Sequence, residues 1–394
     1  MRHRIVLVIV GIAVVVGVTL LLHRYETHDL TLPKDEVFPK SAGESIASAE
    51  VSELPAPRHG VFPSIAELED SPQGFWKTQE CNDFFGWDDT DEEYDFETYR
   101  EENRARMARW IAILEPSSDP DHQLMVALVT SKDSPEESRE RILRLVNAES
   151  PHPLAVSFAL DACARDDAYC DVLHRFLSDE FGEARRNAES WIDVAGYWLN
   201  QGNEAQAIDA LDHALAAPVY DSHFIDYAQV FDRGLAASSQ MSGIERLVAA
   251  IGLAAAGPLG LGIYDTCKDR IESSLLLRRS CAALAARQAA ESDNILGQEI
   301  GASLQKIIFE LDGEPENAQA IEALKAERRA TRNSRMVTNN AVTKFRDEAL
   351  FRSMADHWAV FGEAQAQDFM HAEVLRKVES GEYPPLPECE WPYP

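Results

Sequence analysis

The order of apolar and polar residues divides the chain into an uncharged N-terminal run, a stretch without periodicity and a long periodic body. The run covers residues 5–22, which carry no charge and only one polar side chain, Thr19. As a helix it would be about 27 Å long, close to the thickness of the hydrocarbon core of a bilayer. Residues 5–22 are therefore predicted to form a transmembrane helix.

The residues on either side of this run indicate that it is retained and how it is oriented. A secretory signal peptide has a shorter apolar region than this run and ends in a small-x-small cleavage site. No such cleavage site is found where the run ends. Because Arg2 and Arg4 precede the run, the positive-inside rule places residues 1–4 in the cytoplasm. We expect an uncleaved signal anchor in a bacterial inner membrane, with the rest of the chain in the periplasm. A cleaved peptide is the alternative.

Two further segments flank the body. Residues 23–60 contain four prolines among lysines, glutamates and serines, with almost no periodic apolar pattern, which predicts a tether. Residues 381–394 include the sequence Tyr-Pro-Pro-Leu-Pro and predict a proline-rich tail. Between the tether and the tail, residues 61–380 are expected to form the folded domain.

The body has the apolar period of helices, and helix-capping residues precede several of its periodic segments. Ser134 is followed by a proline at the first helical position and then by glutamates, while Ser242 and Glu245 have the spacing of a capping box. The acidic run at 88–97 predicts a helix that begins near Phe96. We find no alternating run of β-branched residues between turn signals. The pattern predicts an all-α fold of antiparallel helical hairpins.

One predicted hairpin, at residues 188–221, has a more specific pattern. The apolar residues of its first helix share one face, namely Trp191, Val194 and Trp198. Its second helix presents Ala207, Leu211 and Ala214. With Gly202 between the helices and Pro218 near the end, this order resembles the 34-residue tetratricopeptide repeat. Flanking pairs near 120–148, 152–178 and 260–289 share the hairpin pattern without the consensus residues.

The resemblance implies a right-handed superhelix of helical pairs, while a non-repeating, irregular α-bundle fits the same periodicity. Tetratricopeptide arrays bind extended peptides or other proteins on the concave face formed by their first helices. The matching positions in this chain are Glu189, Ile192, Gly196, Leu199 and Asn200. The resemblance therefore implies a peptide-binding groove there. Apart from Asn200, the basic and amide residues that hold a terminal carboxylate in one subset of the family are missing.

Six cysteines in an exported domain predict three disulfides, among 15 conceivable pairings. Cys163 and Cys170 would lie about 10.5 Å apart along one continuous helix, which is beyond disulfide reach. The sequence between them is typical of a turn and cap, so the two can face each other across a hairpin. Cys267 and Cys281 likewise bracket a predicted turn and are expected to pair.

The remaining cysteines, Cys81 and Cys389, pair by elimination, which would tie the start of the body to its tail. Two competing interpretations are reduced, buried cysteines in a cytoplasmic protein and a metal site. A metal site has little support, because the sequence lacks Cys-x-x-Cys and any compact group of cysteines and histidines.

Charge and motifs exclude several function classes. The chain has 37 Lys+Arg against 67 Asp+Glu, a net charge of −30, so no nucleic-acid partner is expected. It contains no Gly-x-Ser-x-Gly, no His-Glu-x-x-His and no Gly-Lys-Ser/Thr phosphate loop. We therefore predict no catalytic residue, no cofactor and no metal.

These observations favour a non-enzymatic, membrane-anchored helical-repeat protein that binds another envelope protein or peptide. One alternative is an envelope hydrolase, which would be favoured by a deep polar pocket where carboxylates converge and have perturbed pKa values. A second alternative is a structural spacer, which would have a featureless acidic surface.

The hairpin assignment predicts the effect of one substitution. If Trp198 is a core residue, Trp198→Asp should unfold the body or destabilise it by several kcal/mol, because it removes apolar contacts and buries a charge. Thermal unfolding of the purified full-length protein measures this effect. Wild-type stability in the variant would show that the repeat assignment is wrong.

Overall fold

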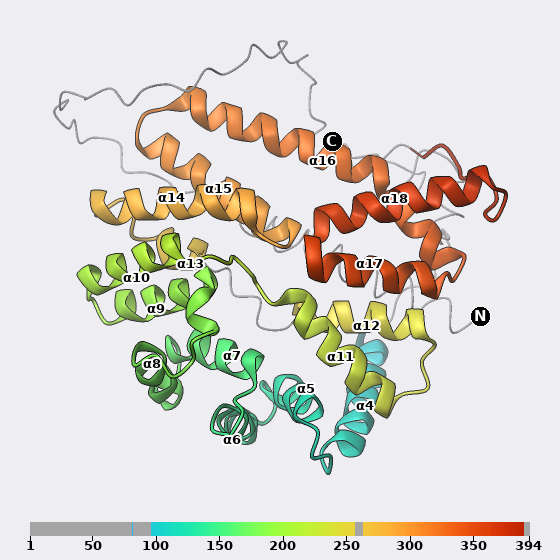
Figure 1. Ribbon diagram of the computed structural model, residues 1–394, viewed down its shortest axis with the longest axis horizontal. Helices are drawn as coiled ribbons and strands as arrows, with labels where there is room; N and C mark the ends of the chain where they lie inside the picture. The colour runs from blue at the N-terminus through green and yellow to red at the C-terminus, as the bar shows by residue number, and fades with distance from the viewer. Residues whose placement is uncertain (1–80, 82–95, 257–262, 390–394) are drawn as a thin grey trace.

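The computed structural model describes Cys81, residues 96–256 and residues 263–389, and every regular element in them is helical (Figure 1). The one β-type pairing among these residues is an isolated parallel bridge between Asn187 and Val219. The predicted all-α fold is therefore confirmed. The predicted stub, anchor and tether lie outside the described residues. No helix in the described ranges is both long and apolar enough to cross a bilayer.

The first half of the described chain consists of helices that follow one another in consecutive pairs. They are α4 (Phe96–Leu114), α5 (Pro120–Thr130), α6 (Pro135–Val146), α7 (Pro153–Cys163), η1 (Asp167–Tyr169), α8 (Cys170–Leu177), η2 (Ala184–Arg186), α9 (Ala188–Asn200) and α10 (Glu204–Ala216). The helices of the second half are α11 (Phe224–Ser238), α12 (Gly243–Ala256), α13 (Ile263–Cys267), α14 (Leu275–Glu291), α15 (Ile295–Leu311), α16 (Pro315–Lys344), α17 (Glu348–Phe361) and α18 (Glu363–Glu379). They include the 30-residue helix α16.

Local capping chemistry sets many of the helix starts. Helices α5, α6, α7 and α16 begin with proline, which loses nothing there because the first N–H groups of a helix have no intrahelical acceptor. At α12 the Ser242 N–H donates to the Glu245 carboxylate at 3.0 Å, as in a capping box. Ser134 precedes α6 as predicted, although its side chain makes no capping hydrogen bond. The acidic run leads into α4 at Phe96.

The hairpin of α9 and α10 buries the faces that the sequence predicted. Trp191 and Val194 of α9 and Leu211 of α10 are each at most 5% exposed. Ala207 is fully buried, and its small side chain allows the two helices to approach closely. Trp198 is half-buried and packs against the edge of the core. The helix pairs are compatible with a helical-repeat fold.

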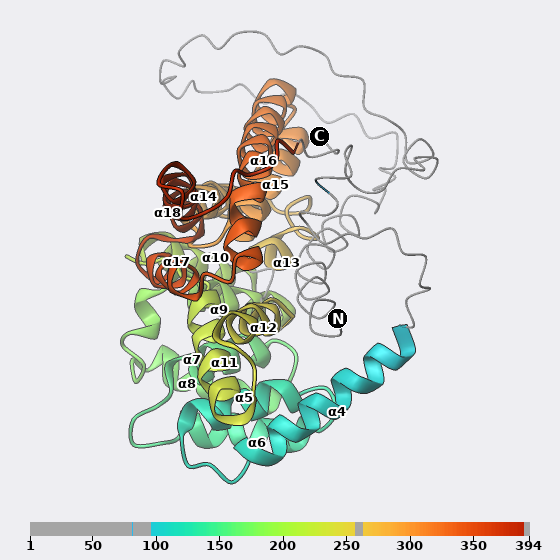
Figure 2. The same cartoon turned by 90° about the vertical axis from the view of Figure 1, so that its right-hand side faces the viewer.

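The path of the chain reverses after α10. Helices α4 to α10 follow one another along an arc, but α11 packs against α4 and α5 instead of continuing the arc (Figures 1 and 2). Helix α14 then returns to α10, and α17 lies against α11 and α12. The second half of the described chain therefore lies over the first half. This brings helix ends together that are distant in sequence.

Three disulfides cross-link the described residues, and their pairings are those expected from the sequence. Their Cα–Cα distances are 4.8 Å for Cys163–Cys170, 6.1 Å for Cys267–Cys281 and 5.7 Å for Cys81–Cys389. The turn predicted between the first pair is present, because the Asp166 carboxylate accepts a hydrogen bond from the Ala168 N–H at 3.0 Å. The third disulfide joins residues separated by 308 positions.

Helices α14 and α15 approach so closely at Gly301 that a Cβ there would lie 2.6 Å from the Ala289 nitrogen and 2.7 Å from the Ala285 oxygen. Gly301→Ala must separate the two helices, and we expect a loss of about 2 kcal/mol in the free energy of unfolding. Gly182→Ala is the control, because a Cβ at Gly182 has no atom within 4 Å. Thermal unfolding compares the two variants, and equal stabilities would contradict the observed packing.

Candidate functional site

Four helices begin close to one another where the two halves of the described chain meet. They are α9, α11, α15 and α18, and each start is tied to another by hydrogen bonds. Carboxylates gather at this point, because a helix N-terminus presents N–H groups and a partial positive charge. Six side chains lie at these helix starts, namely Glu189, Asp221, His223, Asp226, Asp293 and Glu363. We call them the N-terminal junction, after the N-termini of the four helices that meet there.

Asn187 joins the start of α9 to the start of α11. Its Oδ1 accepts hydrogen bonds from the Glu189 and Asp221 N–H groups at 3.2 and 3.1 Å. Its Nδ2 donates to the Asp221 carbonyl oxygen at 2.7 Å and to Nε2 of His223 at 3.2 Å. All four hydrogen-bonding positions of the Asn187 amide are thus used, as expected for a side chain that is 4% exposed. This residue fixes the relative positions of two helices.

Asp293 and Asn294 join the start of α11 to the start of α15. The Ser222 N–H donates to Oδ1 of Asp293 at 3.1 Å, and Nδ2 of Asn294 donates to Oγ of Ser222 at 2.6 Å. Asn294 also caps α15, since its Oδ1 accepts from the Gly297 N–H at 2.6 Å. The second Asp293 oxygen, Oδ2, is buried without a hydrogen-bond partner.

Glu363, the first residue of α18, completes the junction. Its N–H donates to the Asp293 carbonyl oxygen at 2.7 Å, and its carboxylate accepts from the Ile295 N–H at 2.8 Å. The preceding Gly362 has a φ of +85°, and a Cβ there would lie 3.2 Å from the Asp293 oxygen. Glycine fits this position because it adopts positive φ without strain and allows the close approach. The start of α18 is therefore held against the start of α15.

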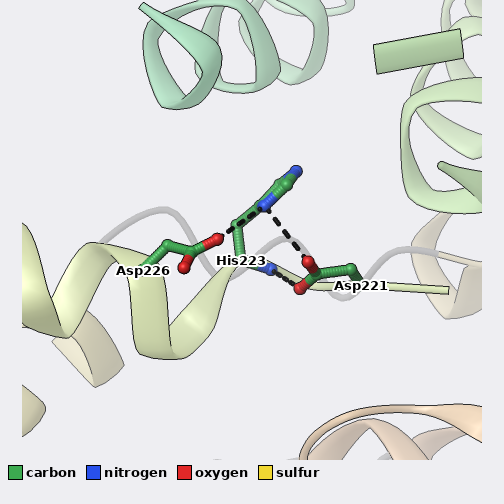
Figure 3. Close-up of side chains that lie close together, drawn as sticks. All are labelled: Asp221, His223 and Asp226. Carbon is green, nitrogen blue, oxygen red and sulfur yellow. Dashed lines mark hydrogen bonds and ion pairs between the residues drawn. The ribbon is translucent and has the colours of Figure 1, made fainter. Parts of the chain in front are cut away.

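Three side chains of the junction, Asp221, His223 and Asp226, form a cluster at the start of α11 (Figure 3). Nδ1 of His223 lies 3.1 Å from Oδ2 of Asp226 and 3.5 Å from Oδ2 of Asp221. His223 has a φ of 57°, which is strained for a residue with a side chain. The strain is offset by the hydrogen bonds that hold the residue in place, including its own N–H to the Asp221 carboxylate at 2.7 Å.

Two carboxylates and an imidazole this close together could in principle hold a metal ion. The Asn187 amide argues against that use. Because its Nδ2 donates to Nε2 of His223, the lone pair of the neutral ring is at Nε2 and the proton is at Nδ1. Nδ1 is the ring nitrogen that faces the carboxylates, and it is then a hydrogen-bond donor to Asp226 rather than a metal ligand. The arrangement fits a hydrogen-bonded Asp–His–Asp group better than a metal centre.

Burial changes the protonation of several of these groups. Burial raises the pKa of Glu189 to about 8, and the charge of Asp293 adds to the shift, while Tyr220 and His223 oppose it. Burial also raises the pKa of Glu363 to about 7, opposed by the Ile295 N–H and Arg332. The pKa of Asp293 is raised by its burial and by the charge of Asp221. Glu189 therefore keeps its proton at neutral pH, and Glu363 keeps its proton below about pH 7.

The pKa of His223 is raised, which is the direction that its carboxylate neighbours favour. Burial lowers its pKa, but the hydrogen bond to Asp226 and the charges of Asp221, Asp226 and Asp293 outweigh burial and raise the pKa above its usual value. The hydrogen bond from Asn187 acts against protonation at Nε2, because a second proton there would face another donor.

The residues of the expected groove do not form an open surface. Ile192 and Leu199 are 0% and 6% exposed, so the prediction that they line a groove is wrong. A Cβ at Gly196 would lie 3.3 Å from Oγ1 of Thr266, because α13 packs against this face of α9. Of the five predicted residues, Glu189 alone belongs to the N-terminal junction.

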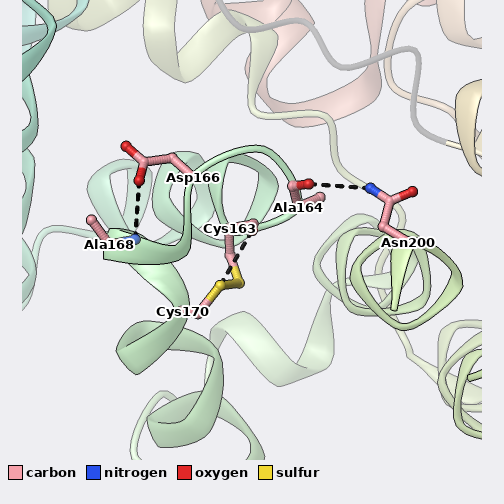
Figure 4. The surroundings of a disulfide bond; sticks show 6 residues. All are labelled: Cys163, Ala164, Asp166, Ala168, Cys170 and Asn200. Carbon is pink, nitrogen blue, oxygen red and sulfur yellow. Dashed lines mark hydrogen bonds between the residues drawn. A yellow bond between two sulfur atoms is a disulfide. The ribbon is translucent and has the colours of Figure 1, made fainter. Parts of the chain in front are cut away.

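Asn200, the fifth predicted groove residue, is exposed but engaged. Its Nδ2 donates to the Ala164 carbonyl oxygen at 3.1 Å, next to the Cys163–Cys170 disulfide (Figure 4). Its Oδ1 accepts from Arg270 at 2.9 Å. Asn200 therefore connects the end of α9 to the end of α7 and to the segment before α14.

Sequence reasoning missed the N-terminal junction. Its local signals are ordinary capping residues, such as Asn187 and Asn294, which occur at helix starts throughout the chain. Nothing in the spacing of these residues indicates that four particular starts meet. Known proteins do not supply that information either. A comparison of the chain with protein-family models, curated proteins and solved structures found no match.

The raised pKa of Glu189 predicts a pH-dependent stability. Between its ordinary value of 4.5 and about 8, the native state keeps a proton that the unfolded chain has lost, so stability falls as pH rises through this range. Glu189→Gln stays neutral. Near pH 5 we expect this variant to have the same free energy of unfolding as the wild type. At pH 8.5 we expect its free energy of unfolding to exceed that of the wild type by on the order of 2 kcal/mol.

Thermal unfolding at the two pH values measures this difference. Glu327→Gln, on an exposed part of α16, is the matched control and should have no effect at either pH. A gain that is the same at pH 5 and pH 8.5 would show that the ionisation of Glu189 is not its cause.

Proposed function

We propose that the chain is a single-pass protein of a bacterial inner membrane whose helical body lies in the periplasm and binds another envelope protein or peptide. Residues 5–22 provide the apolar segment for the anchor. Three disulfides support an oxidising location for the body, since such bonds persist outside the cytoplasm. The packed pair α9–α10 supports a tetratricopeptide-like repeat as its building unit.

The observation that carries the binding function is the exposed apolar end of α17. Val360 is 71% exposed and Phe361 is 52% exposed. The Phe361 ring lies 4.4 Å from the His357 ring, which stacks on Phe369 at 4.7 Å. The exposed ring is thus held in place before any partner arrives, which reduces the entropy lost on binding. Large exposed apolar side chains that adjoin one another are typical of protein-interaction surfaces.

A second exposed apolar pair lies at the start of α14, where Leu275 and Leu276 are 57% and 63% exposed. These two surfaces favour the binding function over a structural spacer, which needs no apolar surface. The chain carries a net charge of −30, so a partner with a basic rim around its apolar contact would associate faster than a neutral one.

A hydrolase is the second candidate, and the converging carboxylates of the N-terminal junction are the observation that favours it. A carboxyl group such as Glu189, which keeps its proton near neutral pH, could act as a general acid. The hydrogen bonds of the junction point to a structural role instead. Glu363 accepts from the Ile295 N–H and Asp293 from the Ser222 N–H, so both carboxylates are used to hold helix starts. We therefore favour the binding function.

The experiment that tests the binding function is in-cell cross-linking of the tagged full-length protein, followed by mass spectrometry of the captured proteins. We expect one dominant envelope partner, and its yield should fall at least about tenfold when Val360 and Phe361 are both changed to lysine, because charge replaces the apolar contact. Ile113→Lys is the matched control, since Ile113 is 52% exposed and lies on a different helix, α4.

Three outcomes separate the candidates. Loss of the partner in the α17 variant but not in the control supports binding at the end of α17. No partner above background from a folded, membrane-inserted protein contradicts the binding function. A partner that is retained by the α17 variant but lost when Leu275 and Leu276 are changed to lysine would move the binding surface to α14.

A further inference from the structure

The three disulfides differ in how firmly the chain around them is held. Cys163–Cys170 joins the end of α7 to the start of α8, and both cysteines are at most 8% exposed (Figure 4). Cys267–Cys281 joins the end of α13 to the interior of α14, and both cysteines are fully buried. A reagent can reach either bond only if helices that pack in the core separate.

Cys389 lies in a different setting, because it is partly exposed and belongs to the non-helical tail after α18. The Tyr383 N–H donates to the Lys377 carbonyl oxygen at 2.9 Å, but residues 384–389 make no hydrogen bond between backbone groups within the described chain. Leu386 is partly buried against the core. Because so few interactions hold this segment, it can open locally while the rest of the protein stays folded.

The first part of the tail is held to the body without the disulfide. Tyr383 is 7% exposed, and its ring centre lies 4.7 Å from that of Phe345. Its hydroxyl donates to the Asp347 carboxylate at 2.8 Å, and Lys377 forms an ion pair with the same carboxylate at 2.9 Å. Loss of the disulfide would therefore free the end of the tail and leave α17 and α18 in place.

We propose that Cys81–Cys389 is a thiol–disulfide exchange site. A dithiol reduces this bond while the two disulfides between helices and the helical fold persist, and the N-terminal part of the chain is then detached from the tail. The difference in packing supplies the selectivity, because a disulfide reacts only when a thiolate can reach it. Within the pair, Cys81 is 3% exposed, so Cys389 presents the sulfur that is open to attack.

The exchange takes two steps. A thiolate of the dithiol bonds to Sγ of Cys389, the disulfide breaks, and Cys81 leaves as a thiolate that takes up a proton. The second thiol of the dithiol then attacks its own sulfur in the mixed disulfide, and Cys389 leaves and takes up a proton. Two electrons pass from the dithiol, which becomes a disulfide, to the cysteine pair. The reverse reaction with an oxidised dithiol restores the bond.

This bond decides where the N-terminal part of the chain is attached to the body. Cys81 follows the predicted anchor and tether in the sequence, and the disulfide joins it to the tail after α18. After reduction, only residues 82–95 connect Cys81 to Phe96 at the start of α4, a connection that can span at most about 50 Å. Exchange would thus move the point at which a membrane anchor holds the body. This consequence rests on the proposed anchor, whereas the exchange itself does not.

Timed reduction of the oxidised full-length protein by dithiothreitol tests the proposal. Free thiols are blocked with N-ethylmaleimide at intervals, and mass spectrometry of peptides identifies the reduced cysteines. We expect Cys81 and Cys389 to be blocked at least about tenfold faster than the other four cysteines, because the tail opens more often than packed helices separate. Circular dichroism should show unchanged helix content while this bond is reduced. Equal rates for the three bonds, or loss of helix together with Cys81–Cys389, would overturn the proposal.

Two variants test whether local opening of the tail exposes the bond. Leu386→Ser removes the apolar contact of the tail end and should speed reduction of Cys81–Cys389 about fivefold or more, with unchanged rates for the other two pairs. Leu375→Ser is the matched control, since Leu375 is 42% exposed on α18, and it should react at the wild-type rate. A wild-type rate in Leu386→Ser would contradict the proposal. None of these rates depends on whether residues 5–22 span a membrane, so the exchange and the anchor are tested separately.

Discussion

The N–H groups at a helix start have no acceptor within the helix, and in this protein four such starts meet in one place. The side chains of Asn187 and Asn294 accept hydrogen bonds from N–H groups of the helices that they precede. The carboxylates of Glu363 and Asp293 accept from N–H groups at the starts of other helices. Because these acceptors come from neighbouring elements, each helix start fixes the position of another. The reversal of the chain after α10, which places the second half over the first, brings these starts together.

The use of carboxylates as acceptors at the helix starts has an electrostatic consequence. Acceptors that are carboxylates carry charge into a half-buried site, where partial positive charges from helix starts offset only a fraction of the repulsion. The result is a set of acids whose pKa values move toward neutral pH, with Glu189 at about 8 and Glu363 at about 7. Glu189 and Glu363, which lie at the starts of α9 and α18, therefore make the stability of the fold depend on pH.

The disulfides and the exposed apolar residues act on other parts of the molecule. Cys163–Cys170 and Cys267–Cys281 each constrain a local turn, whereas Cys81–Cys389 ties the tail to the segment before the first described helix. The apolar end of α17 lies beside the N-terminal junction because Gly362 connects them. The proposed binding surface and the N-terminal junction thus adjoin each other.

The sequence by itself determined the helices, the buried faces of α9 and α10 and the two local cysteine pairs, because capping, periodicity and turns act over a few residues. The third pair followed by elimination. The groove was different: a family pattern placed Ile192 and Leu199 on an open surface, but both are buried, and α13 packs on that face of α9. Which later helix covers a face is a tertiary matter. The N-terminal junction was also decided only by tertiary structure, since Ile295 and Glu363 are 68 residues apart and nothing local to either residue specifies the other.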